Sequence, residues 1–286
     1  MRKCLAGKDL GLTTTKRRSR TRRHKAEKIT DADYADDIAL ITETAGQAQL
    51  FLQALEESSN SVGLHLNESK TKYISINCDP TETIQSLNSN VIERVDNFNY
   101  LGANLKSTEK DIQIRKAKAW AACHQMKEIW KSNMSRELKV RTFLATVESV
   151  LLYGSETWTL TSALTKIVDG AYTRMLRMAL NVNQWRDRIT NTILYGELPR
   201  VSTKIQERRM KLAGHVQRHE DLTANQVLLW KPSHGKRSRG RPKLNYVDLL
   251  LNDTNLQQLE VKELRSLMLD RRLWRKTIDV RTLKPP

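Results

Sequence analysis

Two short runs of strand-forming residues flank a tight acidic turn between Ile29 and Ile41, in the sequence I-T-D-A-D-Y-A-D-D-I-A-L-I. This pattern predicts a β-hairpin with Tyr34, Ala35, Asp36 and Asp37 at its tip. Adjacent carboxylates offer oxygen ligands to hard divalent cations. Two magnesium ions about 4 Å apart can activate an attacking hydroxyl and stabilise the leaving oxygen in phosphoryl transfer. Asp is also common in solvated turns, so the pair alone leaves both interpretations open.

The size and cysteine content of the chain limit the class of protein. Its 286 residues predict more than one domain. The three cysteines, Cys4, Cys78 and Cys123, are far apart and predict neither a disulfide framework nor a thiolate zinc site. No apolar run approaches the roughly 18 residues of a membrane span, and no signal peptide follows Met1. We expect a soluble protein of the nucleus or cytoplasm without a membrane partner.

Charge is divided unevenly along the chain, whose net charge is +17. Residues 1–28 contain eleven Lys and Arg against two acidic residues, and residues 106–286 contain thirty-five against eighteen. Residues 29–105, which include the Asp pair, contain three against twelve. An acidic, cation-binding patch between basic segments suits a protein that holds a polyanion by its phosphates and places metal ions at one bond.

The segment after the hairpin predicts a helix packed on an antiparallel sheet. Thr44 is a candidate cap for a helix with an apolar stripe of Ala48, Phe51, Leu52, Leu55 and Val62, and Gly63 is its candidate end. Alternating residues predict strands at residues 64–67, 72–77 and 98–105. The order strand, strand, helix, strand, strand indicates an α+β layer.

From Thr108 the periodicity becomes helical, with caps predicted at Ser135 and Thr161 and a break at Gly154. Further helices are predicted from Ser202, around residues 244–251, and over residues 261–283. We expect four parts: a basic flexible arm (1–28), a sheet with a packed helix (29–105), a helical region (106–198) and a basic helical C-terminal region (199–286).

Several basic features of the second half predict contacts with nucleic acid. The helix from Ser202 has a basic polar face, which could contact a duplex backbone and comprises Lys204, Arg208, Arg209, Lys211 and Arg218. The loop at residues 232–242 contains Arg239-Gly240-Arg241-Pro242, which fits either a minor-groove hook or a general phosphate-contacting loop. His215 and His219 have the spacing of two metal ligands, but no third ligand follows, which favours ordinary surface histidines.

Three motifs in succession resemble those of a known family. They are Y-A-D-D at residues 34–37, G-L-H-L-N-E-S-K-T at 63–71 and F-N-Y-L-G at 98–102. In this order they resemble the C-terminal part of the reverse transcriptase of non-LTR (LINE-type) retrotransposons, most like the RTE group. The helical segments around residues 129–132, 152–158 and 172–177 are similar to that group's thumb, and Gly240-Arg241-Pro242 is similar to its basic tail.

The resemblance implies a role for individual residues. Asp36 would be a catalytic ligand of Mg²⁺ and Asp37 its supporting neighbour or second ligand, and Tyr34 and Ala35 would lie near the primer terminus and the incoming nucleotide. Lys70 would neutralise or protonate the departing pyrophosphate. The resemblance also implies an RNA template, a DNA primer, and a two-metal transfer of nucleotides. Primer-strand positioning would fall to Tyr100, Leu101 and Gly102, and further nucleic-acid contacts to Arg208, Arg209, Arg239 and Arg241.

The sequence also departs from the family pattern. A full reverse transcriptase has fingers and a first palm strand whose aspartate completes the metal site, whereas only 33 residues precede Tyr34. We therefore expect a polymerase fragment that does not polymerise as an isolated chain. The alternative is a non-catalytic nucleic-acid-binding protein that uses the thumb and the Arg-rich loop.

Overall fold

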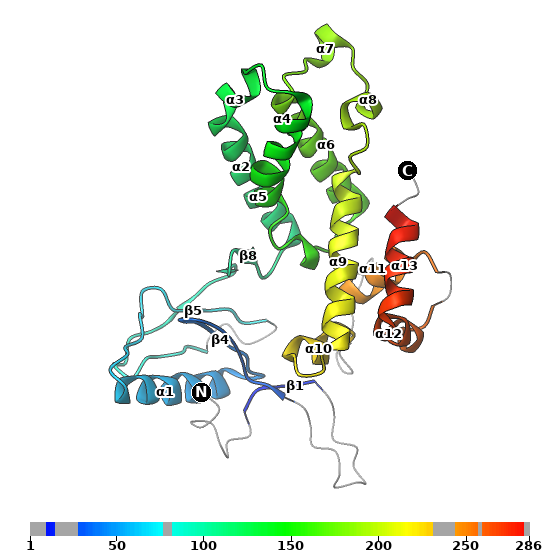
Figure 1. The fold of residues 1–286 in the computed structure, drawn as a ribbon. Coiled ribbons are helices and arrows are strands. Elements are labelled where there is room, and N and C mark those ends of the chain that lie inside the picture. The colour runs from blue at the N-terminus through cyan, green and yellow to red at the C-terminus, as the bar shows by residue number, and fades with distance from the viewer. Residues whose placement is uncertain (1–9, 15–27, 77–81, 231–243, 257–258, 283–286) are drawn as a thin grey trace. The chain divides into compact units, whose positions relative to one another are not determined.

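The computed structural model describes residues 10–14, 28–76, 82–230, 244–256 and 259–282. The chain divides into two compact units (Figure 1). Unit 1 comprises residues 1–106 and 230–235, and unit 2 comprises residues 107–229 and 236–286. Small strand pairs beside one helix characterise unit 1, and helices characterise unit 2. The predicted α+β class is therefore confirmed.

Unit 1 has eight short strands and one helix in its described residues. They are β1 (Leu12–Thr13), β2 (Lys28–Ile29), β3 (Asp31–Tyr34), β4 (Asp37–Leu40), α1 (Ala45–Ser61), β5 (Lys72–Tyr73), β6 (Glu93–Arg94), β7 (Asn99–Tyr100) and β8 (Ala103–Asn104). The strands form four separate two-stranded pairs. The β3–β4 and β7–β8 pairs are antiparallel, as predicted. The β1–β2 pair is also antiparallel, although its first strand lies in the predicted flexible arm, and β5 and β6 run parallel.

Helix α1 begins and ends at the predicted residues. The Thr44 hydroxyl accepts a hydrogen bond from the Gln47 amide at 3.2 Å, which satisfies a free donor of the first turn. Gly63, with φ +80°, lies just past the last turn, where the left-handed region suits glycine. Phe51 and Leu52 are buried as expected. Val62 is exposed because it is the residue that follows the last helical residue, Ser61.

The strand predicted at residues 64–67 is wrong: these residues form no strand and lead into a turn at residues 68–70. The Asn67 carbonyl accepts from the amides of Lys70 and Thr71 at 3.1 and 2.9 Å, and the Asn67 side chain accepts from Ser69 and Lys70. Asn competes in this way with strand pairing because its side chain bonds to nearby backbone. Leu52 of α1 packs with Ile84 and Ile92 in a small core.

Unit 2 contains the remaining helices of the described chain. They are α2 (Thr108–Gln125), α3 (Lys127–Lys131), α4 (Arg136–Phe143), the π-helix η1 (Leu144–Glu148), α5 (Ser149–Leu151), the 3₁₀ helix η2 (Ser155–Thr157), α6 (Ser162–Ala179), α7 (Gln184–Asp187), α8 (Asn191–Tyr195), α9 (Val201–Arg218), α10 (Thr223–Leu228), α11 (Tyr246–Thr254), α12 (Val261–Leu269) and α13 (Arg271–Thr282). None of the described helices is long and apolar enough to span a membrane.

The predicted caps of unit 2 are confirmed. Ser135 and Thr161 accept hydrogen bonds from the Leu138 and Leu164 amides, both at 3.3 Å, and Gly154 has φ +71°. The helical patterns predicted over residues 261–283 form two helices, α12 and α13. Asp270 separates them, because its carboxylate accepts from the amides of Arg272 and Leu273 and thereby caps the second helix.

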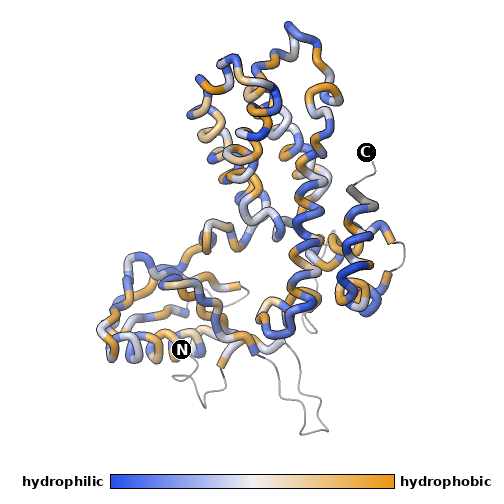
Figure 2. Tube along the Cα trace, in the orientation of Figure 1, coloured by the Kyte–Doolittle hydropathy of each residue, from blue (hydrophilic) through white to orange (hydrophobic). Residues whose placement is uncertain are grey.

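Two buried clusters hold unit 2 together. The larger one joins α2, α4, α6 and the start of α9, and includes Trp130, Phe143, Trp158 and Tyr172. The smaller one joins the second half of α9 to α11, α12 and α13, and includes Met210, Leu250 and Trp274. Helix α9 therefore contributes to both clusters, and its apolar stripe matches the predicted one at Ile205 and Val216. Figure 2 shows this mixture of apolar and polar residues along the helices.

Candidate active site

The predicted acidic hairpin is present as β3 and β4. Asp31 pairs with Leu40 and Tyr34 pairs with Asp37, so that Ala35 and Asp36 form a two-residue turn. Ala35 has φ +55°, in the left-handed region that favours Gly, Asn or Asp in such turns. An alanine held there is strained by roughly 1–2 kcal/mol.

The register determines which side chains share a face of the hairpin. Directly paired residues point to the same face, so Tyr34 lies beside Asp37. Tyr34 is 66% exposed, and both Asp36 and Asp37 are exposed. Neither carboxylate makes a hydrogen bond or ion pair with another described residue. Both are therefore accessible to a cation from solvent.

Two more carboxylates lie on the opposite face of the hairpin. Asp31 and Asp33 alternate with Ala32 along β3, and Asp31 accepts a short hydrogen bond from the Thr30 hydroxyl. Burial raises the pKa of Asp33, and the charge of Asp31 and a hydrogen bond with it raise that pKa further. Like charges thus repel within β3, but the pleat directs these carboxylates away from Asp37.

The hairpin formed by β7 and β8 contacts the acidic hairpin through Tyr100. Its hydroxyl lies 2.8 Å from the Ala32 carbonyl oxygen and 3.2 Å from that of Asp37, and donates its proton to this pair. Burial raises the pKa of Tyr100, and the charges of Asp37 and Asp33 raise it further. The structure therefore brings the predicted primer-positioning tyrosine to the strand that carries Asp37.

The turn of this second hairpin contains the other two predicted primer-positioning residues. Leu101 and Gly102 have φ +49° and +77°, the double left-handed conformation of a tight hairpin turn. Gly102 fits this conformation without strain, whereas Leu101 does not. Leucine is not a residue typical of left-handed turn positions, so the sequence pattern does not predict this conformation of Leu101.

Lys70 lies outside these two hairpins, in the turn made by Asn67. Its amide donates to the Asn67 carbonyl at 3.1 Å, and its side chain is exposed. Among the described residues, no hydrogen bond or ion pair links Lys70 to Asp36 or Asp37. The turn positions the lysine backbone, and the side chain extends into solvent.

The predicted nucleic-acid contact of Arg209 on α9 is wrong for this conformation. Arg209 is only 1% exposed, and its Nη1 lies 2.6 Å from Asp253 Oδ2 on α11. Its position explains the error: it lies four residues after Ile205 and four before Ala213, on the apolar stripe of the helix. That spacing is the sequence signal for burial.

Other cations of the predicted basic face of α9 also have internal partners. Arg208 Nη1 donates to the Leu152 carbonyl at 2.9 Å and lies 3.8 Å from Glu156. Lys204 Nζ donates to buried Glu148 at 2.6 Å. Arg208 is 39% exposed and stays a predicted contact residue. Arg239 and Arg241 lie outside the described residues.

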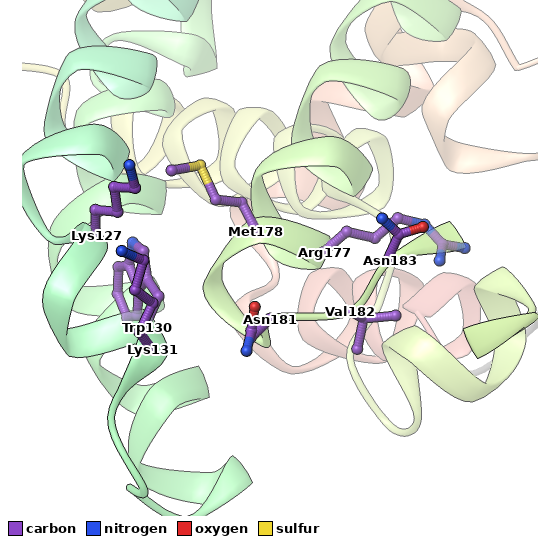
Figure 3. Close-up of a pocket in the computed structure, with 8 residues that line it drawn as sticks. All are labelled: Lys127, Trp130, Lys131, Arg177, Met178, Asn181, Val182 and Asn183. Carbon is purple, nitrogen blue, oxygen red and sulfur yellow. The ribbon is translucent and has the colours of Figure 1, made fainter. Parts of the chain in front are cut away.

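The described part of unit 2 also contains a pocket of about 230 Å³ (Figure 3). Trp130 and Lys131 of α3 lie on one side, and Met178 and Val182 lie on the other. Arg177 also lines it, but its Nη2 donates to Ile189 and Asn191. The pocket contains none of the predicted site residues and no carboxylate, so it is no alternative metal site.

The donor set for a divalent metal ion is incomplete among the described residues. No group of three or more His, Cys, Asp or Glu side chains gathers there in a geometry that could hold an ion. The rings of His215 and His219 lie 4.4 Å apart and Asp221 lies 4.0 Å from His219, but the described residues form no group that could hold a metal ion there. Asp36 and Asp37 are suitable oxygen ligands, but two carboxylates do not enclose a cation.

Comparison with known proteins finds a family match over both hairpins and a relative over most of the chain. Residues 14–105 match the family described as reverse transcriptase (RNA-dependent DNA polymerase). Over 263 residues the chain is 27% identical to an uncharacterized transposon-derived protein of Caenorhabditis elegans, and this match covers 86% of the chain and 94% of that protein. No solved structure matches the chain.

The two matches cover different lengths of the chain. The family match contains both hairpins and the turn of Lys70, whereas the relative extends the likeness into the helices of unit 2. Proteins of the reverse transcriptase family bind nucleic acid templates and primers and use divalent metal ions. Residues 14–105 are thus similar to the reverse transcriptase domain, and most of the chain is similar to a transposon-derived protein.

Proposed function

We propose that the chain is the end of the palm, the thumb and the basic C-terminal region of an RNA-directed DNA polymerase from a non-LTR, RTE-like retrotransposon. The observation that supports this proposal is the position of the Tyr100 hydroxyl, 2.8 Å from Ala32 O and 3.2 Å from Asp37 O. A polymerase must hold the primer terminus close to the carboxylates that act on it. The Tyr100 contact joins the two segments that would perform these tasks.

The proposal gives each hairpin residue a distinct task. Asp36 and Asp37 are assigned as ligands of Mg²⁺, which in the intact enzyme supplies activation of the primer hydroxyl. Lys70 is assigned to the negative charge that develops on the departing pyrophosphate, since an exposed lysine can move to it. Tyr100, Leu101 and Gly102 are assigned to the primer strand of the RNA–DNA duplex.

We expect the isolated chain to bind a template–primer without extending it, because two carboxylates do not complete the metal site. Primer extension with Mg²⁺ tests this expectation on two proteins. One is the isolated chain, and the other is the chain fused behind the fingers and first palm strand of a related retrotransposon enzyme. Each is compared with its Asp36→Asn variant, which removes a charge and keeps the side-chain shape.

The fusion should extend the primer, and Asp36→Asn should slow extension by about a hundredfold or more, since metal ligands contribute several kcal/mol to such reactions. Extension by the fusion that does not depend on Asp36 would contradict the proposal. Template-dependent extension by the isolated chain, abolished by Asp36→Asn, would support a polymerase and overturn the expectation of inactivity.

A second candidate function is nucleic-acid binding without catalysis. It is favoured by the four exposed cations Arg271, Arg272, Arg275 and Lys276 along α13, which exceed the three exposed carboxylates of the hairpin, Asp33, Asp36 and Asp37. Binding of template–primer by a fusion that never extends it would select this function.

A further inference from the structure

The cations of α9 are largely used within the protein. Lys204, Arg208 and Arg209 contact Glu148, Glu156 and Asp253, and Lys211 pairs with Glu207. Arg218 Nη1 donates to the Met268 carbonyl at 2.9 Å. The helix with the most basic sequence face therefore has little uncompensated positive charge to offer a partner.

The cations of α13 are in the opposite situation. Arg271, Arg272, Arg275 and Lys276, which we name the basic ridge, are all exposed. None of these four side chains makes an ion pair or hydrogen bond with another residue in the described part of the chain. The hydropathy colours of Figure 2 show α13 as mainly hydrophilic. Asp279, the acidic residue of this helix, lies three residues beyond the last cation of the ridge.

The ridge brings like charges together. Arg271 and Arg275, and likewise Arg272 and Lys276, are four residues apart and thus neighbours on the helix surface, where like charges destabilise a helix by a few tenths of a kcal/mol. Arg271 also acts on Arg218 of α9. Burial lowers the pKa of Arg218, and the charge of Arg271 lowers it further. A polyanion that neutralises the ridge would relieve this repulsion.

The opposite face of α13 fixes the ridge to unit 2. Trp274 and Ile278 are 2% and 5% exposed, and Trp274 Nε1 donates to the Met210 carbonyl at 2.8 Å. Asp270 caps the first turn. Because the helix is anchored by its apolar face, the four cations are held in place before any partner binds, which lowers the ordering entropy lost on binding.

We infer that the basic ridge on α13 binds the phosphate backbone of a nucleic-acid duplex. The inference rests on the proposed function, which supplies a template–primer duplex as the polyanion. The six residues from Arg271 to Lys276 rise about 7.5 Å along the helix. That length is roughly the axial rise of two nucleotides along one strand, at about 3.4 Å each. Such contacts would position the duplex without reading its sequence.

The test measures the affinity of the full chain for a short fluorescent duplex by anisotropy, at salt concentrations from roughly 50 to 200 mM. The ridge variant is Arg272→Gln, Arg275→Gln and Lys276→Gln together. The matched control is Lys110→Gln, Lys118→Gln and Lys166→Gln, which removes the same charge from exposed positions on α2 and α6. Thermal melts verify that both variants fold.

We expect the ridge variant to lose at least tenfold in affinity and to reduce the salt slope by roughly two to three, since each lost phosphate contact changes it by about 0.9. The control should change the slope by less than one such contact. Equal losses in both variants, or no loss in the ridge variant, overturn the inference and leave the polymerase proposal to its own test. Failure of the wild-type chain to bind any duplex overturns both.

Discussion

At the scale of single residues, one hydroxyl connects the two hairpins of unit 1. Tyr100 reaches backbone carbonyls rather than the Asp37 carboxylate, so it fixes the strand and leaves the carboxylate exposed to solvent. Strained residues lie at both turns, Ala35 in one and Leu101 in the other. Strain of this kind gathers where the surrounding structure holds a site in one conformation.

Removal of this hydroxyl should loosen the acidic hairpin. Tyr100→Phe is expected to lower the free energy of unfolding by about 1 kcal/mol and to speed amide hydrogen exchange in β3 and β4, because two carbonyls lose a donor. Tyr73→Phe is the control, since the Tyr73 hydroxyl donates to Glu82 at 2.9 Å within unit 1. Faster exchange in β3 and β4 from Tyr73→Phe as well would show that the effect is not specific to Tyr100.

The raised pKa of Tyr100 gives the same contact a pH dependence. The group is neutral when it donates, and its folded-state pKa lies above the unfolded value. Its contribution is therefore complete below the ordinary tyrosine pKa of about 10 and is lost as the pH rises through the folded-state value. Wild-type β3 and β4 amides should therefore lose protection, measured relative to their intrinsic exchange rates, as the pH rises through the folded-state pKa of Tyr100. In the Tyr100→Phe variant this loss of protection should be absent.

At the scale of elements, the packing of α9 against α13 depends on the absence of a side chain. A Cβ added at Gly214 would lie 2.3 Å from Trp274 Nε1 and 2.9 Å from Arg218 Nη1. The indole donates to Met210, four residues before Gly214 on the same helix. Gly214 thus allows the close approach that anchors the basic ridge.

Gly214→Ala should therefore destabilise unit 2 by roughly 1–3 kcal/mol, because the indole must shift out of its place in the smaller cluster. The control is Gly170→Ala in α6, where an added Cβ meets nothing within 4 Å. Alanine at that helix position should stabilise by up to about 1 kcal/mol. Urea unfolding measures both, and stabilisation by Gly214→Ala would contradict the packing described here.

The elements also show which structural features follow from sequence. Thr44, Ser135 and Thr161 begin their helices as predicted, because a cap is a contact between residues three apart. The acidic hairpin is equally local. By contrast, Arg209 finds its partner Asp253 far along the chain, and β5 pairs in parallel with β6 across a loop. No local pattern encodes such partners, so the burial of Arg209 and the pairing of β5 required the structure.

At the scale of the whole molecule, the two units have cores of very different size. Unit 1 has a cluster of three buried residues, Leu52, Ile84 and Ile92, with strands that pair only two at a time. Isolated strand pairs are marginally stable in water. Unit 2 has a cluster that joins α2, α4, α6 and α9, with large side chains such as Trp130 and Trp158 fully buried. The acidic hairpin therefore belongs to the less stable unit.

This difference predicts unfolding in two steps rather than one. Amides of α1 and of the β3–β4 hairpin should exchange faster than those of α2 and α6, and should lose protection at a lower urea concentration. Fluorescence of the core residues Trp130 and Trp158 should follow the second step, since both lie in unit 2. A duplex bound to the basic ridge should delay the second step and leave the first unchanged, because a ligand stabilises only the fold it binds. A single coincident transition for all these probes would show that the units unfold as one, and the acidic hairpin would then be as stable as the helical core.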